Sequence, residues 1–296
     1  MLQLIAENQN NDRLDLTGNH VYRTTVTGLN PPNATINTST VGLSDGSIFN
    51  SSRVENRNIV LTIKIVNDVE ASRISLYRIF TVKQPIRLYV KNDARDVFID
   101  GRVENFELNH HENPQSAQIS ILCPTPYFQG MGEDVIESSV TESLFEFPFS
   151  IEEEGIPLGE IKALDFITML NEGDVANGMT VEFVARGEVV NPRIYSVKTH
   201  GKIGLQKTMN EGESIVVTTV NMKKSVYLMS NAEKINFIKY LDRNPEWFQL
   251  SQGENYFTLD ADQGIENLNI RFKHRNEYEA VSYTHLRAHE TRRHLV

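Results

Sequence analysis

The sequence has almost none of the features on which secreted and membrane proteins depend. It contains a single cysteine, Cys123, in 296 residues, so no internal disulfide is possible. The first residues show neither a basic region nor a long apolar segment, and no signal peptide is expected. No apolar run approaches the roughly 18 residues of a membrane span. We therefore expect a protein that is made in a reducing cytoplasm and has no membrane partner.

Positive charge is also scarce. There are 29 Lys and Arg residues against 39 Asp and Glu, a formal net charge of −10. Nonspecific nucleic-acid binding needs a basic surface, so no nucleic-acid partner is expected. A hydrophobic content of 40% with 23% charged residues is typical of globular chains, and the length predicts two domains.

Motifs for catalysis or metal binding are missing. There is no Gly-x-Ser-x-Gly, no P-loop and no His-Glu-x-x-His. His110-His111-Glu112 is the tightest cluster of metal-ligand types, but it precedes Asn113-Pro114 and is typical of a solvated turn. Asp260-Ala261-Asp262 is similar to the start of a calcium loop but lacks its later ligands, which favours a turn. We predict no catalytic residue, metal or cofactor, and Cys123 as a small buried residue at a strand end.

The N-terminal half has the pattern of a β-rich domain with one helix. Ile59, Leu61, Ile63 and Ile65 alternate with Val60, Thr62 and Lys64, as in a half-buried strand. Ile74, Tyr77 and Phe80 follow helical spacing after Asp68, which is a candidate N-cap. The predicted elements are strands at 20–28, 58–66, 86–91, 96–109 and 116–123, and a helix at 69–81.

The segment 29–52 differs from its surroundings. It is dense in Asn, Pro, Thr, Ser and Gly, with turn signals at 30–33 and 45–47. Such a long connection with little apolar pattern predicts either a mobile loop or arm that orders on assembly, or a plain surface loop. Both interpretations stay open at this point.

Cys123-Pro124-Thr125-Pro126-Tyr127-Phe128 divides the chain. Each proline lacks a backbone donor and restricts the residue before it, so a strand cannot continue through this segment. From Gly130 onward, short strand-like runs alternate with turn residues, which predicts a β-sandwich or jelly roll. The predicted strands are 143–151, 180–186, 193–199, 203–207, 214–219, 225–228, 246–250, 255–259 and 267–273, with a short helix at 231–240.

The last sixteen residues break the pattern. Residues 281–296 contain three of the eight histidines and follow a strand-like segment that ends at Ala280. This string resembles a translated sequencing-adaptor sequence, so we exclude it from the fold prediction as a non-native tail.

Several segments in order are similar to the distal tail protein family of siphophages, the hub of the baseplate. The resemblance covers about residues 10–280, and it is carried by 45–54, 58–61, 76–80, 100–104, 113–115, 123–128, 191–194 and 250–257.

The resemblance implies a non-enzymatic virion protein at the phage tail tip. It predicts a mainly β fold, with an N-terminal ring-forming domain at 1–128 and a C-terminal galectin-like β-sandwich at 129–280. Members form hexameric rings between the tail tube protein and the tail-associated lysin or tail fibre, so these partners are expected, together with receptor-binding proteins or a host surface glycan. The alternative is a carbohydrate-binding module on a non-catalytic scaffold, with its contact at Trp247.

The 29–52 loop and the turn around 109–115 are the predicted ring and stacking contacts, because they are long and polar. The residues expected to make these contacts are Asn33, Asp45, Phe49, Arg53, His110 and His111.

Overall fold

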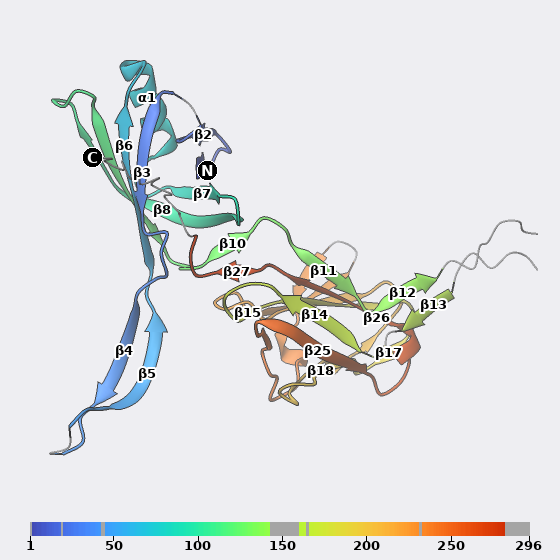
Figure 1. Ribbon diagram of the computed structural model, residues 1–296. Coiled ribbons are helices and arrows are strands. Elements are labelled where there is room, and N and C mark those ends of the chain that lie inside the picture. Colours follow the sequence, from blue (N-terminus) through green and yellow to red (C-terminus); the bar gives the residue numbers. More distant parts are fainter. Residues whose placement is uncertain are drawn as a thin grey trace, which may run out of the picture. The chain divides into compact units, whose positions relative to one another are not determined.

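The computed structural model describes residues 2–18, 20–42, 45–142, 160–163, 166–230 and 233–281. Two compact units form among the described residues: 2–131 together with 278–281, and 132–277. Most described residues lie in strands, and one α-helix is found among them, so the predicted fold class is confirmed (Figure 1). The observed limits differ from the predicted 128 and 280, because the chain passes back into the first unit at residue 278.

The predicted tail of 281–296 lies outside the described residues except for Val281. This side chain is 1% exposed and belongs to the hydrophobic core of the first unit. Its backbone N–H donates to the carbonyl of Leu29 at 3.0 Å. Val281, which the sequence prediction assigned to the non-native tail, thus belongs to the folded first unit.

The first unit is built on one sheet with the strand order β2-β1-β7-β8-β9-β6-β3. Neighbouring strands along this path are antiparallel. The strands are β1 (Gln3–Asn8), β2 (Arg13–Asp15), β3 (Tyr22–Thr27), β6 (Arg57–Ile65), β7 (Pro85–Lys91), β8 (Asp96–Asn109) and β9 (Ser116–Cys123), with β10 (Phe128–Gly130) and β27 (Glu277–Tyr278) off this path.

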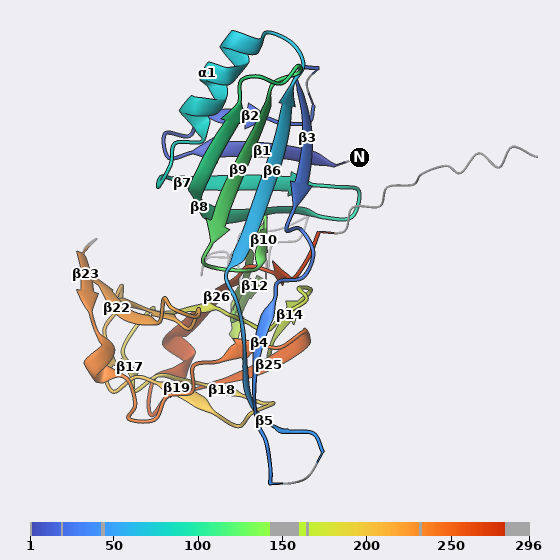
Figure 2. The ribbon, with the colours of Figure 1, turned by 90° about the vertical axis from the view of Figure 1, so that its left-hand side faces the viewer.

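The long strand β8 turns this sheet back on itself. Its first half pairs with β7 and its second half with β9, with a register shift between Val103 and Asn105. A bulge of this kind bends a strand and increases its twist. Figure 2 shows the result: β9 and β6 cross over β1 and β7. The side chains between these layers form the core.

Alternate side chains of β6 point into this core, as predicted. Ile59, Leu61, Ile63 and Ile65 are all 0% exposed. At the β3 end of the sheet, the Thr24 hydroxyl donates to the carbonyl of Leu16 at 2.6 Å. This contact joins β3 to the segment after β2 and partly closes the sheet.

The helix α1 (Val69–Ile79) confirms the helix predicted at 69–81. The apolar residues whose spacing predicted it do not share one buried face, because Ile74 and Tyr77 are 51% and 44% exposed whereas Phe80 is 2% exposed. Asp68 holds the N-cap position with a left-handed backbone, but its side chain makes no cap hydrogen bond. The Tyr22 hydroxyl holds the helix from β3 by donating to a helix carbonyl at 3.1 Å. The buried residues of α1 are Ser72, Leu76 and Ile79.

Arg57, the first residue of β6, is a buried cation, with only 3% of its surface exposed. Burial lowers its pKa, and its guanidinium lies 4.6 Å from the ring centroid of Phe128. It donates at 2.6 Å to four backbone carbonyls, those of Gly28, Asn30, Pro126 and Glu279. One side chain therefore ties together the end of β3, the Cys-Pro-Thr-Pro exit and the returning C-terminal segment.

We predict that Arg57→Met lowers the free energy of unfolding of the first unit by about 3 kcal/mol, because several partly buried carbonyls lose their donor. Denaturant unfolding measures the change. The matched control is Arg53→Met, an exposed arginine four residues away, which is expected to stay within about 0.5 kcal/mol. Equal effects of the two substitutions would contradict the role of Arg57.

Cys123 is fully buried at the end of β9, as predicted. It packs against Gly101, where an added Cβ would lie 2.9 Å from the Cys123 Sγ and 2.7 Å from Ile121. Burial raises the pKa of the Cys123 thiol to about 12. The residue fills the space above a glycine and is poorly suited to act as a nucleophile.

We expect native Cys123 to resist iodoacetamide at pH 8, where only about one thiol in ten thousand is ionised at this pKa. Mass spectrometry should find it unmodified after hours in native buffer and modified in denaturant. A Met222→Cys variant supplies an exposed thiol as the positive control. Rapid labelling of Cys123 in the native wild type would show that it is accessible.

The second unit is a β-sandwich. One sheet has the order β11-β26-β16-β21-β22-β23 and the other β14-β25-β18-β19. The strands of the larger sheet are β11 (Asp134–Glu137), β16 (Thr180–Ala185), β21 (Ser214–Thr218), β22 (Ser225–Ser230), β23 (Glu233–Asn236) and β26 (Leu268–His274). Those of the smaller sheet are β14 (Ile167–Asn171), β18 (Arg193–Ser196), β19 (Lys202–Gly204) and β25 (Gly253–Asp260).

Three short ladders complete the unit. The pairs are β12 (Ser139–Glu142) with β13 (Glu160–Ala163), β15 (Asn177–Gly178) with β24 (Gln249–Leu250), and β17 (Val189–Val190) with β20 (Thr208–Met209).

Aromatic side chains join the two sheets of the sandwich. Phe257 of β25 stacks on Phe272 of β26 with ring centroids 5.6 Å apart, and Phe248 lies 5.5 Å from Phe257. These rings belong to one hydrophobic cluster that draws from both sheets. The predicted sandwich is thereby confirmed.

One prediction for the second unit is wrong, and another falls on residues outside the described ranges. The helix predicted at 231–240 is wrong: β23 pairs with β22 there, and only the short 3₁₀ helix η1 (Ile238–Tyr240) follows. Ile235 and Ile238, which suggested the helical pattern, are 45% and 51% exposed. The strand predicted at 143–151 lies outside the described residues. A second 3₁₀ helix, η2 (Ile265–Asn267), precedes β26.

Candidate functional site

The segment predicted as a loop at 29–52 contains a β-hairpin. Strands β4 (Ala34–Ser39) and β5 (Ile48–Val54) pair antiparallel and form a separate two-stranded sheet (Figures 1 and 2). Of the two interpretations, the plain surface loop is therefore wrong, and the arm that orders on assembly stays a prediction. Threonine, isoleucine and valine in these strands favour extended backbone, and the turn signals fall at the ends of the hairpin.

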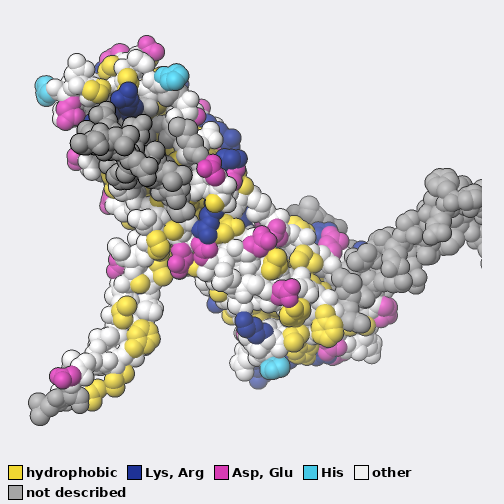
Figure 3. All heavy atoms as spheres, viewed as in Figure 1, with side chains coloured by type: hydrophobic (Ala, Val, Ile, Leu, Met, Phe, Trp, Pro, Cys, Tyr) yellow, Lys and Arg dark blue, Asp and Glu magenta, His cyan; other side chains and the backbone are white. Residues whose placement is uncertain are grey.

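The hairpin has no core of its own. Every described side chain of β4 and β5 is exposed except Thr35, which is intermediate. Figure 3 shows the apolar side chains that stand along it. A two-stranded hairpin is marginally stable by itself, and clustered exposed apolar groups mark interaction surfaces. The exposed apolar residues are Ile36 at 63%, Val41 at 48%, Ile48 at 58%, Phe49 at 61% and Val54 at 38%.

The hairpin is also nearly free of charge. Between Ala34 and Val54 only Asp45 and Arg53 are ionisable. Polar groups satisfy one another across the strands, as where the Asn37 amide donates to the Ser51 hydroxyl at 3.0 Å. A partner of this hairpin would need a neutral surface with apolar contacts and backbone groups for strand pairing.

The predicted contact residues fall into two groups. Asn33, Asp45, Phe49 and Arg53 are exposed and lie on the hairpin or at its ends. His110 and His111 lie in the exposed turn between β8 and β9.

These groups stand at opposite ends of β6. Arg57, at the base of the hairpin, pairs with Cys123, whereas Lys64 pairs with Ser116 beside the histidine turn. The separation of Arg57 and Lys64 is about 23 Å along the strand. No three His, Cys, Asp or Glu side chains gather as metal ligands in the described ranges, and no described helix is long and apolar enough to cross a membrane.

Trp247 is partly buried against the core of the second unit. The Lys224 ammonium lies 5.5 Å from its ring centroid. This arrangement uses the indole for packing and leaves less of its face available for stacking on a sugar ring. The predicted glycan contact at Trp247 stays a prediction.

Arg57 is the residue that sequence reasoning missed. Its position carried a signal, because it shares the alternating parity of Ile59 and Leu61 and so had to point into the core. A cation at a buried position of a strand requires acceptors, and the carbonyls at the base of the hairpin supply them.

Part of the chain matches a known family. Residues 172–276 match the family model for the siphovirus-type tail component, C-terminal domain. The predicted resemblance to siphophage distal tail proteins is confirmed by this match and by the fold. No curated protein sequence matches the chain.

Solved structures share the fold across nearly the whole chain. The Dit protein of phage SPP1, described as a paradigm of the hub adsorption apparatus in phages that infect Gram-positive bacteria, matches with a TM-score of 0.62 and 13% identity. That match covers 93% of this chain and 99% of the other. Chains of the phage P2 baseplate in its activated conformation match with TM-scores of 0.52 with calcium and 0.51 with strontium, at 9% and 10% identity. Each covers 95% of this chain and 100% of the baseplate chain.

The exposure of the hairpin predicts that it can be shortened without loss of the fold. Replacing residues 36–52 by Asn-Gly keeps the Thr35–Arg53 pair and closes it with a two-residue turn. We expect the free energy of unfolding to change by less than about 1 kcal/mol, as measured by denaturant titration. A larger loss would mean that the hairpin supports the core of its own chain.

Proposed function

We propose that this protein is a structural component of a phage tail tip. It forms a hexameric baseplate hub that joins the tail tube protein to the tail-associated lysin or fibre. The match of 172–276 to a siphovirus-type tail component and the fold shared with the SPP1 and P2 proteins support a tail role. The exposed, neutral hairpin is the observation that carries the assembly part of the proposal.

A closed ring of identical subunits needs two different surfaces that fit each other. The hairpin is the first. For the second we propose the free edge of β3, which borders a pocket of about 490 Å³ in the first unit. Its lining contains no ionisable side chain: the apolar contributions come from Leu2, Val26, Leu29 and Val281, and the polar ones mainly from threonines. Neutral surfaces of this kind suit strand pairing combined with apolar packing.

The second unit has a separate role in this proposal. It holds the fibre, the lysin or receptor-binding proteins, or contacts a host surface glycan. The protein acts without catalysis, is made in the host cytoplasm and ends in the virion. Its role is to hold the tail components in fixed positions. Packing surfaces are sufficient for this role.

Light scattering after size exclusion tests the assembly claim. We predict a wild-type particle of six times the chain mass, alone or with the tail tube protein. Combining Ile36→Thr, Ile48→Thr and Phe49→Ser should reduce it to one chain, because burial of three large apolar side chains is lost. The matched control is Met222→Ser in the second unit, where the side chain is 97% exposed. A hexamer that survives the triple substitution, or a wild type that stays monomeric at about 100 µM with the tube protein present, would contradict the proposal.

A further inference from the structure

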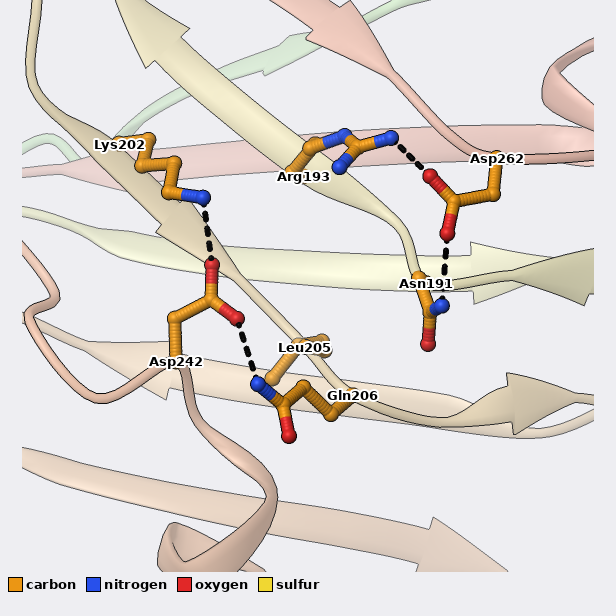
Figure 4. Close-up of a pocket in the computed structure, with 7 residues that line it drawn as sticks. All are labelled: Asn191, Arg193, Lys202, Leu205, Gln206, Asp242 and Asp262. Carbon is orange, nitrogen blue, oxygen red and sulfur yellow. Dashed lines mark hydrogen bonds and ion pairs between the residues drawn. The ribbon is translucent and has the colours of Figure 1, made fainter.

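A polar pocket of about 290 Å³ lies in the second unit, next to β18 and β19 (Figure 4). Its side chains form two hydrogen-bonded groups with Leu205 between them. In the first group, Asp262 accepts from the Asn191 amide at 2.7 Å and from Arg193. In the second, Asp242 meets the Lys202 ammonium at 3.1 Å and the Gln206 amide at 3.3 Å.

The backbone holds both carboxylates in place. The Asp262 N–H donates to Val190 at 2.9 Å, and the Asp242 N–H donates to Gly204 at 2.9 Å. Gly204 is needed for this arrangement, because a Cβ there would stand 2.4 Å from the Asp242 Oδ2. The strand β19 thus leaves room for Asp242 to lie over its glycine and reach Lys202.

These side chains retain capacity for a ligand after pairing among themselves. A carboxylate offers about four acceptor positions, and Asp242 and Asp262 each have two partners. Lys202 has three N–H donors and one carboxylate partner. Pairing therefore fixes the orientation of each group while leaving donors and acceptors free, which lowers the entropy cost of binding.

The charges of the lining select the ligand. Arg193 and Lys202 lie among three carboxylates, those of Asp242 and Asp262 in the lining and that of Asp260, which accepts from Arg193 at 2.7 Å, so an anion is disfavoured. A metal ion would meet two fixed cations, and a phosphate would meet two carboxylates. What fits is a neutral molecule that presents donors and acceptors together on a small ring. Leu205, which is buried, supplies an apolar contact between the two groups.

We propose that this pocket binds a saccharide through paired hydroxyl groups. Charge-assisted hydrogen bonds from Asp262 and Arg193 hold one part of the sugar, and those from Asp242 and Lys202 hold another. Tyr195 stands beside them, because it shares a face of β18 with Arg193 and pairs with Lys202 of β19. The site is distinct from Trp247; its role rests on the glycan contact proposed above for the second unit, and its test is independent of ring assembly.

Binding of the full chain to an array of neutral, acidic and phosphorylated oligosaccharides tests the proposal, followed by titration calorimetry of the bound sugar. We expect a neutral saccharide to bind with a dissociation constant in the roughly millimolar range or tighter, with little dependence on ionic strength. Asp242→Asn and Asp262→Asn should each weaken binding about tenfold or more, because a charge-assisted acceptor is lost. Gln206→Ala, which changes no charge, should weaken it less.

Glu137→Gln is the matched control. It neutralises another carboxylate of the same unit that pairs with an arginine, Arg271, and it should leave sugar binding unchanged. Trp247→Phe separates this pocket from the predicted tryptophan contact. Melting curves and particle mass establish that each variant is folded and assembled. Absence of saccharide binding at about 10 mM, preference for anionic sugars, or binding that survives both aspartate substitutions in folded protein would overturn the proposal.

Discussion

The buried guanidinium of Arg57 fixes the geometry on which the first unit depends. Its four acceptors come from the end of β3, from the exit after β9 and from the C-terminal segment that returns to the unit. Without this donor each of those carbonyls, three at partly buried residues and one at the exposed Asn30, would lose a hydrogen bond to a charged group. An arginine suits the position because its planar fork serves several acceptors at once. The prolines at 124 and 126 set the direction of the chain after β9, and Arg57 holds this segment by donating to the carbonyl of Pro126.

The hydrogen bonds of Arg57 explain how a well-packed unit can carry an exposed hairpin. The strands β4 and β5 continue from β3 and toward β6, and both of these belong to the sheet. The hairpin base is held by Arg57 through Gly28 and Asn30, while the side chains beyond it have no core to enter. Apolar groups presented on a fixed base bind with a smaller entropy loss than the same groups on a flexible loop. The structure thus has the form expected of a subunit whose stability and assembly use different residues.

The sequence predicted much of the fold because several strands alternate clearly. The predicted limits of β6, β8 and β9 lie within one residue of those observed, and in β6 and β9 alternate residues are buried. The strands of the hairpin were not predicted, because both of its faces are exposed and alternation of burial cannot appear where nothing is buried. The helix was predicted from the spacing of Ile74, Tyr77 and Phe80, although Ile74 and Tyr77 are exposed. In the second unit many strands were predicted, but β14 was missed, and its pairing with β25 joins segments far apart in the chain.

The candidate sites were harder to predict, for a related reason. Asp262 was visible as part of a turn, yet Asp242, Arg193 and Lys202 come from three other segments that only the fold brings together. Asn33, Asp45, Phe49 and Arg53 lie on or beside one hairpin because they are close in sequence, whereas the histidine turn lies at the other end of β6. Local composition indicated exposed polar segments but could not indicate which of them share a surface.

Hydrogen exchange of the backbone amides in β4 and β5 tests the central claim that this hairpin is an assembly surface. If it is, peptides covering residues 34–54 exchange rapidly in the dilute monomer and become strongly protected in the assembled particle. Peptides from the core strand β6 should be protected in both states. Hairpin exchange that is equally fast in monomer and assembled particle would contradict the account.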